Sequence, residues 1–171
     1  MDAELRKRLH GLRNCVQSRI LVTNDVERRI GLRALDAFEQ LTPGQPPSAQ
    51  TVGALATAAR SCESQVGCTG AVLLNYLAVH HEPAREAIRQ LLAEENEHAN
   101  YWAVSATVLH EKLPDCFVEE ILRAALANKH AKVKMSAANT AMQLGLRSLL
   151  PYIVETRRNI TRRNATTQNT Y

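Results

Sequence analysis

The side chains that could do chemistry in this chain of 171 residues are its cysteines, its paired histidines and glutamates, and its arginines. The cysteines form no CxxC pair and show no zinc-type spacing. None of them lies in a glycine-flanked nucleophile elbow, and the chain has no glycine-rich phosphate loop. We therefore expect no catalytic residue, and we interpret each cysteine as a small, buried apolar residue. The alternative is a reactive thiol, for which Cys116 is the best candidate because it lies at a predicted helix start. The cysteines are Cys15, Cys62, Cys68 and Cys116.

Two histidine-containing segments could bind a metal ion. The step from Glu95 to His98 would place a carboxylate and an imidazole on one helix face, as in di-iron carboxylate proteins. Such a site needs a second Glu-x-x-His step, and this chain has none. His80 and His81 end a predicted helix before Pro83, where protonated imidazoles interact favourably with the helix dipole. We therefore expect neither a metal ion nor another cofactor.

Arginines are the strongest candidates for a binding role. Arg89 and Arg123 lie 34 residues apart, and Arg85 is on the same predicted helix as Arg89. If the spacing reflects a structural repeat, the guanidinium groups stack on one surface and could hold phosphates or a partner's acidic strip. Arg157 continues the spacing, with Arg158 beside it. The same helices carry glutamates that could pair with these arginines instead: Glu86, Glu119 and Glu120.

Helices must position these side chains, because Leu and Ala dominate the composition and no stretch shows two-residue alternation. Apolar residues recur at three- and four-residue steps between breaks marked by Pro and Gly, the clearest being the loop over 42–47. In the first helix this stripe consists of Leu5, Leu9, Leu12, Val16 and Ile20. The predicted helices cover residues 2–21, 26–41, 48–61, 65–79, 84–94, 97–112, 115–127, 131–145 and 148–159.

Local signals define several helix ends. The segment Thr23-Asn24-Asp25 and the residue Ser48 precede apolar periodic runs, as N-cap residues do. Pro83 and Pro114 begin new helices, where the missing N–H costs nothing, and Gly145 ends one.

A nine-residue pattern recurs in the second half of the chain, over residues 66–74, 101–109 and 133–141. Each copy has a bulky residue first, small residues at the fifth and sixth places, and an apolar residue at the ninth. Offsets of 32 and 35 residues are typical of stacked helical hairpins. The small residues would let one helix approach its neighbour closely. The turns over 96–99 and 128–131 recur at the same spacing.

This pattern resembles HEAT-like repeats, a group that includes the short bacterial units of phycobilisome lyases. Residues 133–141 are closest to the family's first helix, and the resemblance covers about residues 63–160. The family's Asp-Pro turn is absent, and Gly67, Trp102 and Lys134 stand where its typical Arg would be. An irregular alpha-alpha superhelix or a plain helical bundle stays open as an alternative.

The resemblance implies an all-α fold, an alpha-alpha superhelix of HEAT-like solenoid type with about four helical hairpins plus a leading helix. We predict a single helical-repeat domain over 1–160, with irregular helices over 1–62 and regular repeats over 63–160. Residues 161–171 have no apolar periodicity and are expected to form a polar, basic tail.

Charge and hydropathy indicate which partners and which cellular location to expect. The net charge of +4 is too small for a dedicated nucleic-acid coat, although arginines crowd the first predicted helix and the end of the chain. The first residues do not resemble a signal peptide, and no apolar stretch approaches the length of a membrane span. We therefore expect a cytoplasmic protein with free thiols and no membrane partner.

By its resemblance the chain is expected to be a non-enzymatic scaffold or adaptor that docks another protein on the concave face of the array. The binding residues would be Arg85, Arg89, Arg123, Arg157 and Arg158, with Trp102 as an aromatic anchor. For Trp102 the alternative is burial against a neighbouring helix. Binding of nucleic acid or another polyanion through the basic helices is the second hypothesis. A lyase-like chaperone of a tetrapyrrole, based on the resemblance and the spare cysteines, is the third.

Overall fold

The computed structural model describes residues 3–42, 44–105, 107 and 113–168. Within these ranges the chain forms helices joined by short connections, and it contains no strand. A single turn of 3-10 helix over Arg147–Leu149 precedes the last helix. The helices are α1 (Ala3–Gln17), α2 (Asp25–Glu39), α3 (Ala49–Ala59), α4 (Ser64–Ala78), α5 (Glu82–Ala93), α6 (Glu97–Ser105), α7 (Asp115–Leu126), α8 (Ala131–Gln143) and α9 (Leu150–Gln168).

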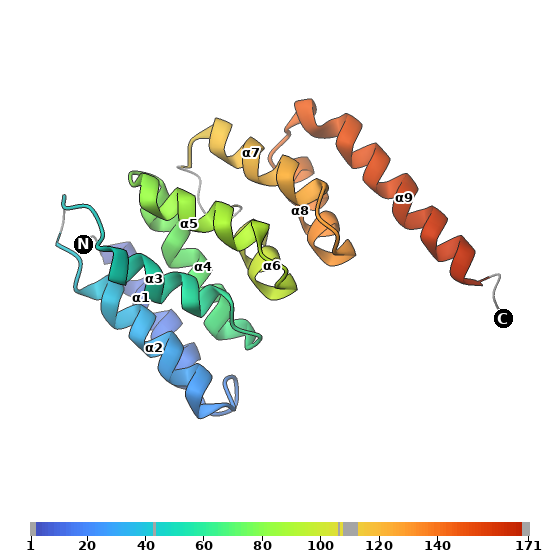
Figure 1. The fold of residues 1–171 in the computed structure, drawn as a ribbon. Coiled ribbons are helices and arrows are strands. Elements are labelled where there is room, and N and C mark those ends of the chain that lie inside the picture. The colour runs from blue at the N-terminus through green and yellow to red at the C-terminus, as the bar shows by residue number, and fades with distance from the viewer. Residues whose placement is uncertain (1–2, 43, 106, 108–112, 169–171) are drawn as a thin grey trace.

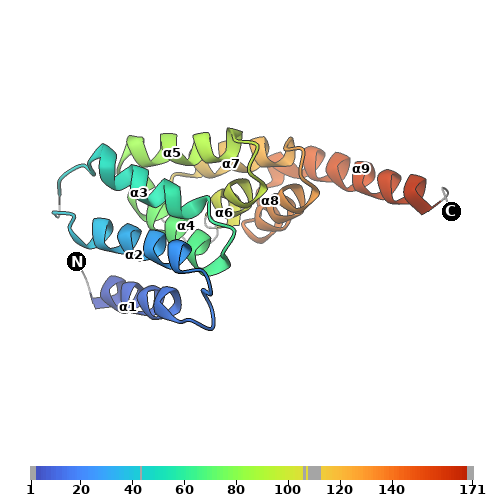
Figure 2. The same cartoon turned by 60° about the horizontal axis from the view of Figure 1, so that its bottom comes forward.

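The helices that follow α1 stack in two layers (Figure 1). One layer consists of α2, α4, α6 and α8, and the other consists of α3, α5, α7 and α9. Figure 2 shows α5, α7 and α9 in one row, and α1 packs on α2 and α4 at the N-terminal end of the array. In its described part the chain is therefore an all-α superhelical arrangement of four hairpins behind a leading helix. This confirms the predicted fold class.

Several helix ends lie where the local signals predict them. The Oδ1 atom of Asn24 accepts a hydrogen bond from the backbone N–H of Val26 at 2.8 Å, which caps α2. The Oγ atom of Ser48 caps α3 in the same way, by accepting from the N–H of Thr51 at 3.1 Å. Gly145 follows α8 with a φ of 66°, a conformation that glycine adopts without steric strain.

The first helix is shorter than predicted. It ends at Gln17, and Ile20, predicted to belong to its buried stripe, is 89% exposed. Beyond the helix end the chain turns, and the N–H of Val22 bonds to the carbonyl of Ser18 at 2.9 Å. The turn carries Ile20 into solvent and buries Val22 in its place. The apolar spacing in the sequence therefore extends to Ile20, although the helix itself ends at Gln17.

The last helix is longer than predicted. It continues to Gln168, whereas the sequence predicted a helix end near 159 and a tail without periodicity. Pro151 lies in its first turn, where the missing N–H costs nothing. Adding residues to an existing helix is far easier than nucleating one, so polar residues can prolong a helix that is already anchored. The predicted helix over 97–112 can be followed only to Ser105, because 106 and 108–112 lie outside the described residues.

Gly70 allows the close approach of α3 and α4. A Cβ atom added at Gly70 would lie 2.3 Å from the backbone nitrogen of Ala59 and 2.5 Å from the carbonyl oxygen of Leu55. Both are main-chain atoms of α3, so a side chain could be accommodated only by separating the two helices. This confirms the role predicted for the fifth place of the nine-residue pattern. In the third copy, Ala137 and Ala138 occupy the corresponding places and are buried.

Replacing Gly70 by alanine should lower the free energy of unfolding by about 2–3 kcal/mol, because the added methyl group overlaps the backbone of α3. The matched control is Gly53→Ala on α3, where an added Cβ meets nothing within 4 Å. The control should raise the free energy of unfolding by about 0.5–1 kcal/mol through helix propensity. Urea unfolding followed by circular dichroism measures both, and equal effects would contradict the close approach.

Candidate interaction surface

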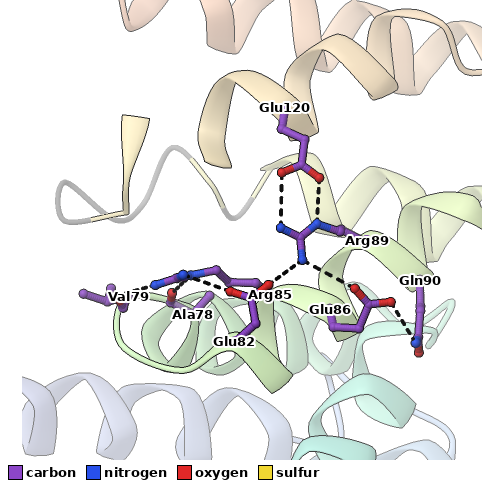
Figure 3. A network of polar contacts seen from close by, with 8 residues as sticks. All are labelled: Ala78, Val79, Glu82, Arg85, Glu86, Arg89, Gln90 and Glu120. Atoms are coloured by element: carbon purple, nitrogen blue, oxygen red, sulfur yellow. Dashed lines mark hydrogen bonds and ion pairs between the residues drawn. The ribbon is translucent and has the colours of Figure 1, made fainter. Parts of the chain in front are cut away.

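Arg85 caps the C-terminal end of α4. Its Nε atom donates to the carbonyl oxygen of Ala78 at 2.7 Å, and Nη2 donates to that of Val79 at 3.0 Å (Figure 3). Carbonyls at a helix end have no partner within the helix, so these bonds satisfy groups that would otherwise need water. Its Nη1 atom lies 3.0 Å from a carboxylate oxygen of Glu82. Arg85 therefore stabilises the turn between α4 and α5.

Arg89 links α5 to α7. Its Nε and Nη2 atoms bond to the two carboxylate oxygens of Glu120 at 2.6 and 3.2 Å, and Nη1 bonds to Glu82 at 2.7 Å (Figure 3). The guanidinium carbon also lies 5.4 Å from the ring centroid of Phe117 on α7. The hydrogen bond with Glu120 raises the pKa of Arg89, and the hydrogen bond from Arg89 lowers the pKa of Glu82.

Arg123 occupies the corresponding place one hairpin later. Its guanidinium carbon lies 5.7 Å from the ring centroid of Tyr152 on α9, and Nη2 bonds to Glu119 at 2.8 Å. Each of the two arginines thus reaches an aromatic ring of the next helix in its layer, as the 34-residue spacing would require. The carboxylates of Glu120 and Glu119 pair with Arg89 and Arg123, which was the alternative to guanidinium groups stacked on one surface for a partner.

Trp102 packs against α4. A Cβ atom added at Gly67 would lie 2.3 Å from Nε1 of Trp102 and 2.5 Å from its Cδ1 atom, so the indole edge lies directly over the glycine. Trp102 is half-buried, and its ring meets that of Tyr101 edge to face at 5.0 Å. Of the two interpretations of Trp102, the structure shows packing between neighbouring helices. The contact also explains the glycine at position 67, because a side chain there would displace the indole.

Arg157 and Arg158 lie on α9 and are exposed. The Nη2 atom of Arg157 lies 3.5 Å from the sulfur of Met142, which joins α9 to α8. The predicted binding arginines therefore differ in exposure. Arg85 and Arg89 are half-buried and contact the turn before α5 and helix α7, whereas Arg123, Arg157 and Arg158 are exposed.

Sequence reasoning missed a group of exposed apolar side chains on the last hairpin. Of the nine large hydrophobic side chains exposed in the described ranges, six lie between residues 135 and 154. One of these, Tyr152, is partly covered by Arg123. Within the described chain, α8 and α9 are followed by no further hairpin that could cover them. We call the other five side chains the end face: Met135, Met142, Leu144, Leu150 and Val154.

The end face lies in the basic part of the chain. Residues 121–171 contain nine lysines and arginines but a single acidic residue, Glu155. The first 120 residues hold sixteen acidic and twelve basic residues, so their charge has the opposite sign. The exposed arginines nearest the end face in sequence are Arg147, Arg157 and Arg158. The modest net charge of +4 is therefore the sum of a basic part, residues 121–171, and an acidic part, residues 1–120.

Comparisons with family models, curated proteins and solved structures find no match to this chain. The resemblance to HEAT-like repeats accordingly stays a prediction. In the described part of the chain, no helix is both long enough and apolar enough to cross a membrane. The same part contains no group of three or more His, Cys, Asp or Glu side chains that could hold a metal ion. The prediction that each cysteine is buried is wrong, because Cys62 and Cys116 are exposed and Cys15 and Cys68 are half-buried.

Replacing Arg89 by glutamine should lower the free energy of unfolding at neutral pH by about 1 kcal/mol, because a network of ion pairs between two helices is lost. Arg33→Gln is the control, since Arg33 is exposed on α2 and forms no ion pair within the described residues. The pKa of Glu82 is lowered in the folded chain, so its stabilising contribution is present above its ordinary pKa of 4.5 and is lost as the pH falls. The difference between wild type and Arg89→Gln should therefore shrink below pH 4.5. A difference independent of pH, measured by urea unfolding across this range, would contradict the network.

Proposed function

We propose that this protein is a non-enzymatic scaffold or adaptor that binds another protein on the surface of its helical array. The observation that supports the proposal best is the end face. Large apolar side chains scattered singly over a surface are common, but a group confined to one hairpin is typical of interaction sites. Leaving such a group in water favours association with any surface that can cover it.

The contacts of the arginines support the same proposal in a different way from the one the sequence suggested. Arg89 and Arg123 connect successive helices of one layer, so they hold the array in register. In the proposed scaffold these arginines maintain a rigid surface, and the partner is bound by the exposed residues at the end of the array. A surface that is already ordered loses little conformational entropy when a partner docks.

Affinity capture tests the scaffold function. The full chain, tagged and immobilised, should retain a specific protein from a nuclease-treated extract of its source cells, and an excess of untagged chain should displace that protein. The nuclease treatment ensures that retention does not depend on a nucleic-acid bridge. Quantitative mass spectrometry measures the enrichment, and the absence of any protein enriched over bare resin would contradict the scaffold function.

Binding of a polyanion is the second candidate, and the specific observation in its favour is the excess of basic residues over 121–171. A salt titration with duplex DNA separates the two functions. Nucleic-acid binding falls steeply with salt because bound counterions are released from the phosphates. No binding of DNA at low salt eliminates the polyanion function, and tight, steeply salt-dependent binding favours it over the scaffold.

A further inference from the structure

The exposed side of α9 carries apolar and cationic side chains in sequence along the helix. Val154 lies four residues after Leu150, and Arg157 and Arg158 lie three and four residues after Val154, so these side chains gather on one side of the helix. The adjoining side holds Ile153 and Thr156, both buried, and the Thr156 hydroxyl lies 3.5 Å from the carbonyl oxygen of Leu126 on α7. One side of α9 therefore packs on the array, and the other side presents an apolar stripe that ends in two arginines.

The exposed side of α8 continues this stripe. Met135 and Met142 are seven residues apart, two helical turns, and both are exposed, Met135 to 53%. The sulfur of Met142 accepts a contact from Nη2 of Arg157 at 3.5 Å, which brings the two helices' exposed sides together. Methionine side chains are flexible and polarisable, so they can fit apolar partners of different shape.

Earlier hairpins show what such a face contacts when the array continues. Helix α5 is covered on its outward side by α7, where Phe117 lies under Arg89 and Glu120 pairs with it. The covering helix thus supplies both an apolar group and a carboxylate. Helices α8 and α9 have no such neighbour within the described residues.

Charge decides which occupant fits. Two copies of this chain packed end to end would bring together either two basic ends or a basic end and α1, whose basic residues outnumber its single glutamate, so like charges would meet in both arrangements. Nucleic acid would satisfy the arginines but leave the methionines, leucines and valine without apolar partners. Tyr152, the exposed aromatic side chain of the same hairpin, already has the guanidinium of Arg123 over its ring, which leaves less of the ring for a stacked base.

We propose that the end face, with Arg157 and Arg158 at its edge, binds an acidic amphipathic helix of a partner protein. The helix would lie on α8 and α9 where a further hairpin of the array would otherwise pack. Its apolar stripe covers the end face, and its carboxylates pair with the arginines, in the manner of a helix laid on an apolar groove. This inference rests on the proposed scaffold function and specifies the chemistry of the partner.

Synthetic peptides of about 16 residues, long enough for four helical turns, test the proposal. One peptide carries leucines at helical spacing with glutamates elsewhere; a second keeps the leucines and replaces every glutamate by lysine; a third scrambles the first. Fluorescence anisotropy with the full chain should show binding of the first peptide that is at least about tenfold tighter than binding of the other two. Equal binding of the lysine peptide would overturn the charge argument, and equal binding of the scrambled peptide would overturn the apolar one.

Variants of the chain locate the site. Met142→Ser combined with Val154→Ser should weaken binding of the glutamate peptide by about tenfold or more, since both side chains would face its apolar stripe. Arg157→Gln combined with Arg158→Gln should weaken it and reduce its salt dependence. Ile20→Ser combined with Leu21→Ser is the matched control, because it removes exposed apolar side chains at the other end of the array and should change nothing.

Circular dichroism should show unchanged helicity in all three variants, because every substituted side chain is exposed. Wild-type affinity in the Met142 and Val154 variant would overturn the proposed site, as would loss of affinity in the Ile20 and Leu21 control. If that end-face variant still captures the same cellular protein, the scaffold function stands and the site is wrong. If the wild type captures no protein at all, the scaffold function itself is wrong.

Discussion

The side-chain amide of Asn100 joins three successive hairpins of the array. Its Nδ2 atom lies 2.7 Å from the carbonyl oxygen of Leu91 and 3.2 Å from that of Leu92, at the end of α5. Its Oδ1 atom accepts a hydrogen bond from Nδ2 of Asn128, just before α8, at 3.0 Å. Asn100 itself is on α6 and is completely buried. Losing this amide would leave helix-end carbonyls in the interior without a partner, which costs more than the net value of the bonds themselves.

Similar polar contacts continue along the same edge of the array. The hydroxyl of Ser61 donates to a carboxylate oxygen of Glu27 at 2.6 Å, and Nδ2 of Asn96 donates to the carbonyl of Arg60 at 3.3 Å. Each contact ties a turn between hairpins to an earlier part of the array. The contact between Asn100 and Asn128 adds to the packing of α8 on α6 and α7 in placing the hairpin that carries the end face. Buried Asn100 and half-buried Asn128 thus contribute to the pre-organisation of the proposed docking surface.

The features that could be predicted from the sequence are those that depend on the spacing of nearby residues. Helix periodicity, capping residues and the small residue at Gly70 could all be recognised, because each acts within a few residues or repeats at a fixed interval. The pairing of Arg89 with Glu120 could not be assigned, since it depends on how α5 and α7 lie relative to each other. The exposure of Ile20 and of Val154 could not be recognised either. Both follow the same spacing as buried residues, and they are distinguished only by the end of a helix at Ile20 and, at Val154, by the lack of a covering helix among the described residues.

The coupling between Asn100 and Asn128 is the most direct test of this account. The free energies of unfolding of Asn100→Ala, Asn128→Ala and the double variant, obtained by urea denaturation, complete a double-mutant cycle with the wild type. If the hydrogen bond between the side-chain amides of Asn100 and Asn128 joins the hairpins, the effects of the two substitutions on the free energy of unfolding should be non-additive. The coupling free energy should be about 1 kcal/mol. Strict additivity of the two effects would contradict it, because the two side-chain amides would then contribute to stability independently of each other.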